Sequence, residues 1–229
     1  MIISHRYKFI FLKTNKTAGT SVEIALSKIC GPDDVITPIS PEDEKTRKEL
    51  GYRGCQNYKY PKWEFGFWRI AKYFRKGIRN FKFYNHMSAR EIRAFVGPEI
   101  WDSYYKFAVE RNPWDRIVSF YYWHKPEPLP PFSKFLKSRV LLRLKRKGFD
   151  VYTIKGKNVA DKICRFENIA TELEEVRLHL GIPESLDMPR AKSRSRKIKR
   201  DHKEYFDEEE RAKVAKLFSR EIELFGYEF

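Results

Sequence analysis

Apolar and polar residues follow two periods along the chain, one typical of strands and one typical of helices. Residues 7–13 (YKFIFLK) are rich in aromatic and β-branched side chains, as expected for a strand in the buried core of a sheet. From Thr20 to Ile29 the apolar positions recur at helical spacing, and Gly31-Pro32 ends that pattern. The first predicted unit is therefore a strand, a loop of small residues and a helix.

The same order of elements returns twice later in the chain. Residues 105–110 (YKFAVE) are predicted as a strand, and Pro113 suits the first turn of the helix that follows. Residues 163–166 are a third predicted strand, followed by a helix that ends at Gly181. Each unit places a loop between the carboxyl end of a strand and the start of a helix.

Local signals predict four further elements. Residues 81–84 have the composition of a strand, and Ser88-Ala89-Arg90-Glu91 has the capping-box pattern that begins a helix, here ended by Gly97-Pro98. Residues 132–147 are predicted as one amphipathic helix with a basic outer face. A last helix is predicted to begin near Asp207, with Glu210 in the capping-box position.

Strands that alternate with helices, without an internal repeat, predict an α/β fold with a central parallel sheet of about four to five strands and helices on both faces. The length of 229 residues suits a single domain over 1–229. Residues 32–80 keep no sustained period apart from a short helix near 69–76, so we predict an insertion. It either lines an acceptor cleft or is an aromatic-rich loop packed on the core.

The charge balance points to an anionic ligand. Lys and Arg number 47 against 31 acidic residues, which gives a formal net charge of +16. The three cysteines form no CxxC pair, which argues against a disulfide framework or a zinc site and suits a reducing compartment. The first residues lack a signal-peptide core, and no apolar run approaches the length of a membrane span. We therefore expect a cytoplasmic protein that begins at Met1.

The segment from Lys13 to Ser21 (KTNKTAGTS) has the features of an anion-binding loop. It joins a predicted strand to the start of a helix, where unpaired backbone N–H groups and the helix dipole favour a phosphate. Lys16 adds a charge, Gly19 allows close approach of the backbone, and Thr20 and Ser21 offer hydroxyl groups. The segment lacks the GxxxxGK[ST] pattern of a Walker A loop. A simple capping turn of small residues is the alternative.

Two segments carry a family resemblance. Lys16-Thr17-Ala18-Gly19-Thr20-Ser21 resembles the 5′-phosphosulfate-binding loop of sulfotransferases that use PAPS (3′-phosphoadenosine 5′-phosphosulfate), in the carbohydrate-type and bacterial family. Asn15 stands where that loop usually has proline. Residues 107–121 (FAVERNPWDRIVSFY) resemble the family's 3′-phosphate-binding segment. The resemblance implies a P-loop-type three-layer fold, with residues 16–21 as a phosphate-binding loop and Arg111 and Ser119 on the 3′-phosphate. A purely structural Arg–Asp network at residues 111–116 is the alternative.

A third likeness lies in the C-terminal region. It covers Arg165-Phe166-Glu167-Asn168, the basic loop at Pro189-Arg190, Tyr205-Phe206-Asp207 and residues 225–229. Residues 190–203 hold eight Lys or Arg in fourteen positions, too polar for a core element. In related enzymes a C-terminal loop folds over the nucleotide, which implies that Lys192 and Arg194 close on PAPS. A solvated run of charge is the alternative.

The resemblance implies transfer of a sulfuryl group from PAPS to an acceptor hydroxyl or amine, with carbohydrates among the candidate acceptors. The acceptor must lose a proton as sulfur is attacked, and a neutral imidazole is the usual base near pH 7. His86, just before the helix that begins at Ser88, is the candidate, and His124 is the second choice. Lys16 is expected to stabilise charge on the departing 5′-phosphate.

Two other classes of function fit parts of the sequence. A P-loop kinase or nucleotide hydrolase shares the order strand, anion loop and helix, but the Walker A glycines are absent and no carboxylate pair is spaced for a catalytic metal. We therefore expect no metal. A basic module that binds nucleic acid would suit the charge of +16, although no standard motif for it is visible.

Overall fold

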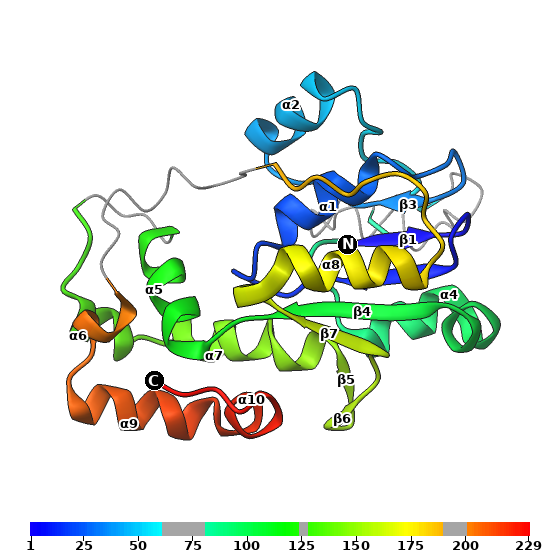
Figure 1. Cartoon of the computed structure of the whole chain (residues 1–229). Coiled ribbons are helices and arrows are strands. Elements are labelled where there is room, and N and C mark those ends of the chain that lie inside the picture. Colours follow the sequence, from blue (N-terminus) through cyan, green and yellow to red (C-terminus); the bar gives the residue numbers. More distant parts are fainter. Residues whose placement is uncertain (61–80, 124–127, 190–200) are drawn as a thin grey trace, which may run out of the picture.

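The computed structural model describes residues 1–60, 81–123, 128–189 and 201–229. At its centre is a sheet of five strands (Figure 1). The strands are β1 (Ile2–Ser4), β2 (Phe9–Leu12), β3 (Val35–Ile36), β4 (Tyr105–Glu110) and β7 (Lys162–Arg165). Their order is β3-β1-β2-β4-β7. The predicted number of strands is therefore confirmed.

The sheet is mixed, so the prediction of an all-parallel sheet is wrong at one strand. β2 pairs parallel with β4 and β4 pairs parallel with β7, whereas β1 runs antiparallel to both of its neighbours. The cause is the short connection between β1 and β2, which spans residues 5–8 and includes Lys8 with a φ of 52°. So short a connection can join only antiparallel strands. Three residues are also too few for β1 to show a period in the sequence.

Helices cover both faces of the sheet, because successive side chains of each strand point to opposite sides. Helices α1 (Gly19–Ser27) and α8 (Ile169–His179) pack on one face, and α4 (Ala89–Ser103) packs on the other (Figure 1). The first face is formed by Phe9, Phe11, Phe107 and Val109, and the second by Ile10, Leu12 and Ala108. The α/β architecture with helices flanking a central sheet is thus confirmed.

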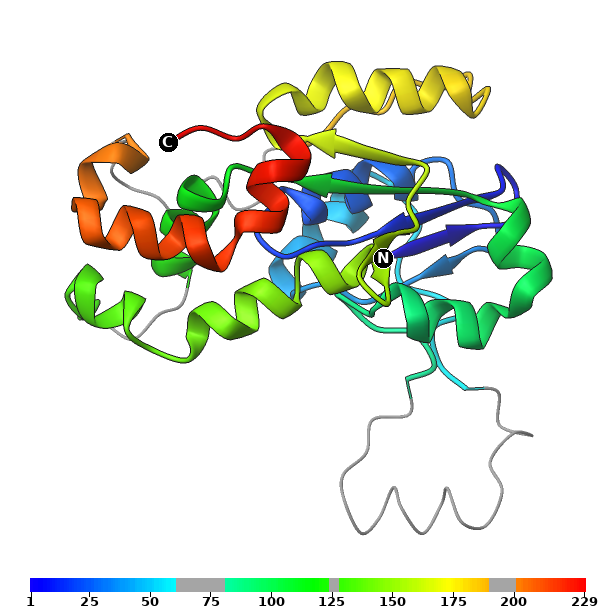
Figure 2. The same cartoon turned by 90° about the horizontal axis from the view of Figure 1, so that it is seen from below.

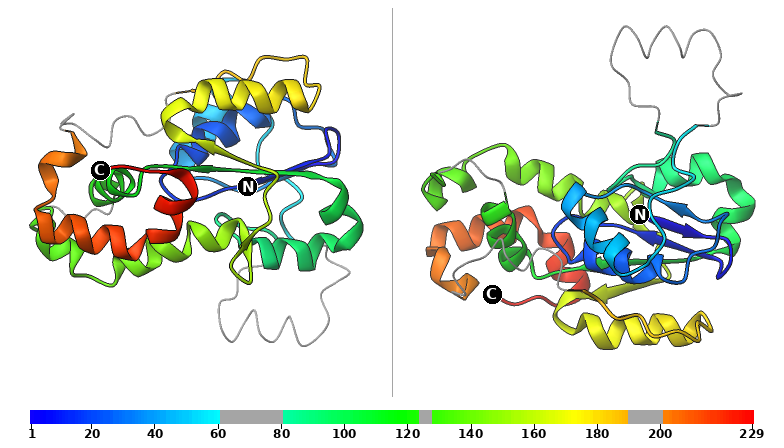
Figure 3. Two further views of the ribbon diagram at one scale, coloured as in Figure 1. Left: turned by 60° about the horizontal axis from the view of Figure 1, so that its bottom comes forward. Right: turned by 90° about the horizontal axis from the view of Figure 1, so that it is seen from above.

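A third apolar cluster lies beyond the carboxyl end of β4 (Figures 2 and 3). It is formed by α5 (Pro113–Trp123), α6 (Phe132–Leu136), α7 (Val140–Arg146), α9 (Glu208–Leu217) and α10 (Ser219–Phe225). The remaining elements are α2 (Pro41–Glu49), η2 (Phe149–Val151), β5 (Thr153–Ile154), β6 (Lys157–Asn158), η3 (Phe166–Asn168) and η5 (His202–Tyr205). In the described ranges, no helix combines the length and the apolar character needed to cross a membrane.

Both capping boxes predicted from the sequence are present. Ser88 and Glu91 form one at the start of α4, and Asp207 and Glu210 form one at the start of α9. The predicted helix over 132–147 is instead two helices, α6 and α7. Where α6 ends, the backbone N–H and the hydroxyl of Ser138 both donate to the carbonyl of Phe135, three residues earlier.

The predicted strand over 81–84 is absent. Only an isolated bridge joins Phe81 to Lys59, and the backbone N–H groups of Lys82 and Phe83 both donate to the carbonyl of Tyr58. Because both N–H groups share one acceptor, residues 81–84 do not form the regular hydrogen bonds of a β-strand.

The predicted insertion, residues 32–80, contains more regular structure than its sequence pattern indicates. β3 and α2 lie within its described part. Helix α2 has no apolar stripe, because the side chains that it buries are those of Asp43 and Arg47. Within α2, Nη1 of Arg47 lies 3.0 Å from Oε1 of Glu44, and Nη2 of Arg47 lies 3.8 Å from Oε1 of the buried Glu23, outside α2. The short helix predicted near residues 69–76 lies outside the described residues.

A buried carboxyl group in α10 generates a prediction about stability. Glu221 is 1% exposed, and neither of its carboxylate oxygens accepts a hydrogen bond from another described residue. Burial, together with the neighbouring charge of Glu110, raises the pKa of Glu221 from 4.5 to about 7. The folded protein therefore holds this proton more tightly than the unfolded chain does.

The contribution of Glu221 to stability should fall as pH rises from 4.5 to 7, because the folded protein must then either keep a proton that the unfolded chain releases or bury a charge. Glu221→Gln removes that cost and should raise the free energy of unfolding at pH 8 by up to about 3 kcal/mol, with little change near pH 4. Urea unfolding at both pH values measures this. Glu223→Gln, at an exposed position of the same helix, is the control, and parallel pH profiles of wild type and Glu221→Gln would contradict the prediction.

Candidate functional site

The loop over residues 13–18 leads from the carboxyl end of β2 directly into α1. β2 lies beside the parallel strand β4, so the loop lies at the carboxyl ends of the parallel strands, where open α/β folds bind ligands. Lys16 and Ala18 have positive φ angles of 67° and 59°. Ala18 is the N-cap of α1 and offers no side-chain cap, and the first turn of α1 contains no acidic residue. The start of α1 therefore keeps the polarity that favours an anion.

Glycine is required at position 19 by a close approach within the loop itself. A Cβ atom at Gly19 would lie 2.9 Å from Cγ of Lys13 and 3.3 Å from the carbonyl oxygen of Thr14. The hydroxyl of Thr14 donates to the carbonyl of Val109 in β4. The hydroxyl oxygens of Thr14 and Thr17 lie 2.7 Å apart. The loop is thus folded tightly against the neighbouring strand.

Three carbonyl groups of the loop accept hydrogen bonds from side chains of other elements. Nδ1 of His86 lies 2.9 Å from the carbonyl oxygen of Lys13. Nε of Arg116 donates to the carbonyl of Asn15 at 2.8 Å, and Nη1 of Arg111 donates to that of Lys16 at 3.3 Å. The structure therefore brings together His86, Arg111 and the loop, three features that the sequence singled out separately.

Arg111 is held by contacts on several sides. Its Nε donates to Oδ2 of Asp115 at 2.7 Å, and its Cζ lies 3.9 Å from the ring centroid of Phe166. The Arg–Asp pair named as a structural alternative thus exists, and Arg111 reaches the loop in addition to it. The pair and the aromatic ring fix the plane of the guanidinium group at the carboxyl end of β4.

Ser119 lies on the stripe of α5 that faces the loop. Residues four apart share one face of a helix, so Asp115, Ser119 and Trp123 line up along α5. Asp115 contacts Arg111 at one end of the stripe, and Nζ of Lys16 lies 5.5 Å from the ring centroid of Trp123 at the other. Ser119 stands between these two contacts, on the same side of the helix.

The contact of His86 with the loop fixes its tautomer. A carbonyl oxygen can only accept a hydrogen bond, so in the neutral ring the proton is on Nδ1 and the lone pair is on Nε2. Nε2 makes no hydrogen bond within the part of the chain that the structure describes. Burial, then the positive charge of Lys13, lowers the pKa of His86 from 6.5 to about 3. His86 is therefore neutral at pH 7, with Nε2 able to accept a proton.

The two lysines of the loop have different environments. Lys13 is 4% exposed and forms a buried ion pair with Glu23 of α1, and its Nζ also donates to Oδ1 of Asn85 at 3.2 Å. Burial alone would raise the pKa of Glu23, but Lys13 and the neighbouring cations lower it to about 2. The ammonium group of Lys13 is thus bound to Glu23 and Asn85 in the interior. The ammonium group of Lys16 instead lies over the ring of Trp123, which is 42% exposed.

Sequence reasoning gave no role in the site to several residues whose contacts support the loop or a predicted side chain, although Lys13 stood in the predicted loop and Asp115 in the alternative Arg–Asp network. They are Lys13, Asp115, Arg116, Trp123 and Phe166. Asp115 and Trp123 could have been found from their helical spacing to Ser119. Three predicted residues, His124, Lys192 and Arg194, lie outside the described residues. Among the described side chains there is no group of three His, Cys, Asp or Glu residues arranged to hold a metal ion.

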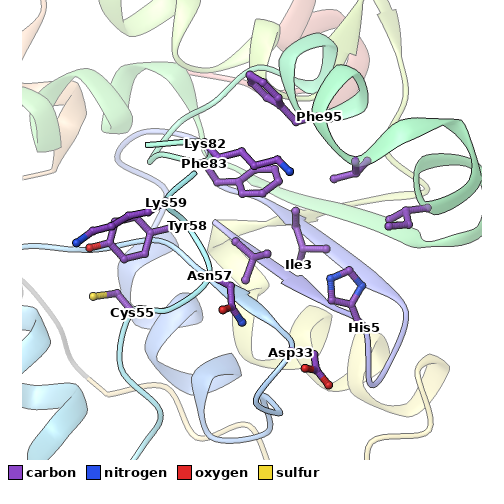
Figure 4. Close-up of a pocket in the computed structure, with 13 residues that line it drawn as sticks. Ile3, His5, Asp33, Cys55, Asn57, Tyr58, Lys59, Lys82, Phe83 and Phe95 are labelled. Carbon is purple, nitrogen blue, oxygen red and sulfur yellow. The ribbon is translucent and has the colours of Figure 1, made fainter. Parts of the chain in front are cut away.

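The described part of the insertion lines a cavity of about 770 Å³ (Figure 4). His5 and Asp33 lie toward one end of it and Tyr58 and Lys59 toward the other, with Ile3 between them. None of the predicted site residues that the structure describes lines this cavity. The cavity is therefore separate from the loop and its three donors.

Comparisons with known proteins identify the family. The profile of the sulfotransferase family matches residues 1–160, which include the loop, His86, Arg111 and Ser119. An uncharacterized protein of Archaeoglobus fulgidus is 33% identical over 108 residues, which cover 44% of this chain and 88% of the relative. No solved structure matches the chain. The family match spans well over half of the 229 residues, so the chain belongs to the sulfotransferase family.

Proposed function

We propose that the protein transfers a sulfuryl group from PAPS to a hydroxyl or amine group of an acceptor. Residues 16–21 bind the 5′-phosphosulfate, and Arg111 and Ser119 bind the 3′-phosphate. The acceptor oxygen or nitrogen attacks sulfur, the bond from sulfur to the 5′-phosphate oxygen breaks, and Nε2 of His86 takes the acceptor proton. The products are a sulfated acceptor and adenosine 3′,5′-bisphosphate.

One observation carries this proposal. His86 and Arg111 hydrogen-bond to carbonyl groups of the same loop, those of Lys13 and Lys16. A candidate base and a candidate phosphate ligand are thus bonded to carbonyl groups three residues apart, in a backbone segment that leads into a helix start without a side-chain cap. Sulfuryl transfer from a nucleotide needs such an anion site and a base within reach of each other.

Electrostatics favours departure of the bisphosphate. Negative charge grows on the 5′-phosphate oxygen as the S–O bond breaks. Lys16 and the N–H groups at the start of α1 stabilise that charge, and they raise the rate to the extent that they bind it more strongly in the transition state.

The donor itself is expected to tune the base. In the free protein, burial and the charge of Lys13 hold the pKa of His86 near 3, too low for an efficient base. PAPS brings several negative charges to the loop, and these should raise the pKa of His86 when it binds. The base therefore becomes effective when the donor is in place.

The proposal extends to the fold and the acceptor. The strand, loop and helix over residues 9–27 support a P-loop-type fold, and we assign all of 1–229 to one domain. No metal is needed, because the positive groups at the loop come from the protein. Carbohydrates are the first acceptors to test. A P-loop kinase and a basic nucleic-acid-binding module are the competing functions.

Ligand-induced stabilisation separates these functions. Adenosine 3′,5′-bisphosphate at 100 times its Kd, without Mg²⁺, should stabilise the fold by about 2.7 kcal/mol, or roughly 5–10 °C in Tm. Differential scanning fluorimetry measures the shift. A larger shift with Mg²⁺ and ATP would support the kinase. Salt-sensitive retention on DNA, without a shift from the bisphosphate, would support the nucleic-acid-binding module.

Arg111→Ala should weaken binding of adenosine 3′,5′-bisphosphate more than binding of adenosine 5′-monophosphate, because only the bisphosphate carries the 3′-phosphate. Loss of this charge-assisted contact should weaken the binding free energy of the bisphosphate by about 2–5 kcal/mol. Isothermal titration calorimetry with both ligands measures the difference. Arg90→Ala, at an exposed position of α4, is the control. Equal weakening of both ligands would make Arg111 a structural residue and refute its assignment.

His86→Ala should keep near-normal affinity for the bisphosphate yet lose about 10²–10⁴-fold in turnover, the range expected when a general base is removed. Lys16→Ala should lose both affinity and turnover. Both variants are compared with wild type in a PAPS-dependent assay on an accepted substrate, with circular dichroism to verify folding. Normal turnover by folded His86→Ala would assign the base elsewhere, and His124→Ala is then the next variant.

A further inference from the structure

Arg116, in α5, contacts three other segments: the end of β4, the loop and the carboxyl-terminal end of α7. It is 1% exposed, and its Nη1 forms an ion pair of 2.9 Å with Oε1 of Glu110 at the end of β4. Its Nε donates to the carbonyl of Asn15 in the loop, and its Nη2 lies 3.4 Å from the carbonyl oxygens of Leu144 and Lys147. All three nitrogens of the guanidinium group are thus used, each toward a different segment.

The partners of Arg116 are themselves fixed. The second carboxylate oxygen of Glu110 accepts a hydrogen bond of 3.0 Å from the hydroxyl of Tyr152. The backbone N–H of Asn15 donates to the carbonyl of Lys147 at 3.0 Å, so Asn15 is held through both its N–H and its carbonyl group. Proline at position 15 would have no N–H to make the first of these bonds.

The guanidinium group also fits against a glycine. A Cβ atom on Gly148 would lie 2.5 Å from both Nη1 and Nη2 of Arg116, closer than side chains can approach. Gly148 follows the carboxyl-terminal end of α7, next to Lys147. The space that this glycine leaves sets where the guanidinium group lies, and therefore where the carbonyl of Asn15 is held.

We propose that Arg116 is a positioning residue for donor binding: it holds Asn15 in place and so sets the position of Lys16 and the amide groups that follow. This inference rests on the proposed function of the loop. Arg116 is fully buried and its guanidinium is committed to protein partners, so it acts through the loop and not by contact with the donor. It is distinct from Arg111, which lies five positions earlier and reaches the carbonyl of Lys16.

The ion pair with Glu110 and the contact with Asn15 have separable consequences. A lysine at position 116 keeps a positive charge for Glu110, but its single ammonium group lacks the planar fork that also reaches Asn15, Leu144 and Lys147. Arg116→Lys should therefore remain folded while the loop loses one anchor. Arg116→Met would leave Glu110 buried without a counter-charge and is a poorer test, because it risks unfolding.

Two measurements test the proposal on Arg116→Lys. Hydrogen exchange of the peptide that contains residues 13–18, in the protein without ligand, should be at least about tenfold faster than in wild type, the change expected from loss of one charge-assisted hydrogen bond. The Kd for adenosine 3′,5′-bisphosphate should rise by a similar factor. Gly148→Ala, which displaces the guanidinium without removing it, should change both quantities in the same direction.

Controls separate positioning from general destabilisation. Gly54→Ala places a Cβ where no atom lies within 4 Å and should change neither quantity. Ile182→Ala removes a buried side chain beyond the end of α8 and should lower stability without changing exchange in the loop. If Arg116→Lys and Gly148→Ala exchange and bind like wild type, the proposal is overturned. If wild type itself does not bind the bisphosphate, the proposed function fails, and loop exchange alone still decides the role of Arg116.

Discussion

The site depends on one constraint: the carbonyl groups of the short loop between β2 and α1 must find hydrogen-bond donors inside the protein. Buried backbone groups without partners are costly. Here the carbonyls of Lys13, Asn15 and Lys16 accept hydrogen bonds from His86, Arg116 and Arg111, respectively. All three donors are far from the loop in the sequence. A loop whose carbonyl groups are satisfied from outside can present its N–H groups to an anion. The same three bonds bring the candidate base and the candidate phosphate ligand to the loop.

Buried charge is the second feature of the site. Lys13 pairs with Glu23 below the loop, and Arg116 pairs with Glu110 beside it, with all four side chains at most 4% exposed. Removing one partner of such a pair leaves an uncompensated charge in the interior, which is strongly destabilising. Neither pair is therefore free to bind a donor. Our proposal therefore assigns the contact with the nucleotide to Lys16, Arg111 and the start of α1, and the role of base to a neutral His86.

Much of this arrangement could be predicted from the sequence, because strand, loop and helix units leave clear local signals. β4 and both capping boxes were predicted at their observed residues. The antiparallel strand β1 and the polar helix α2 were not, because three residues show no period and a helix that buries Asp43 and Arg47 shows no apolar stripe. The same limit holds in the site. Arg116 stood inside a recognised segment, but its contact with Asn15 joins residues 101 positions apart and leaves no local trace.

The most direct test of the account is a crystal structure of the protein with adenosine 3′,5′-bisphosphate. The account predicts the 5′-phosphate on the N–H groups of residues 17–21 and on Lys16, the 3′-phosphate on Arg111 and Ser119, and the carbonyls of Lys13, Asn15 and Lys16 still bonded to their three side-chain donors. Nε2 of His86 should face the 5′-phosphate end of the ligand. A bisphosphate bound away from this loop, or a loop that turns its carbonyl groups toward the phosphate, would contradict the account.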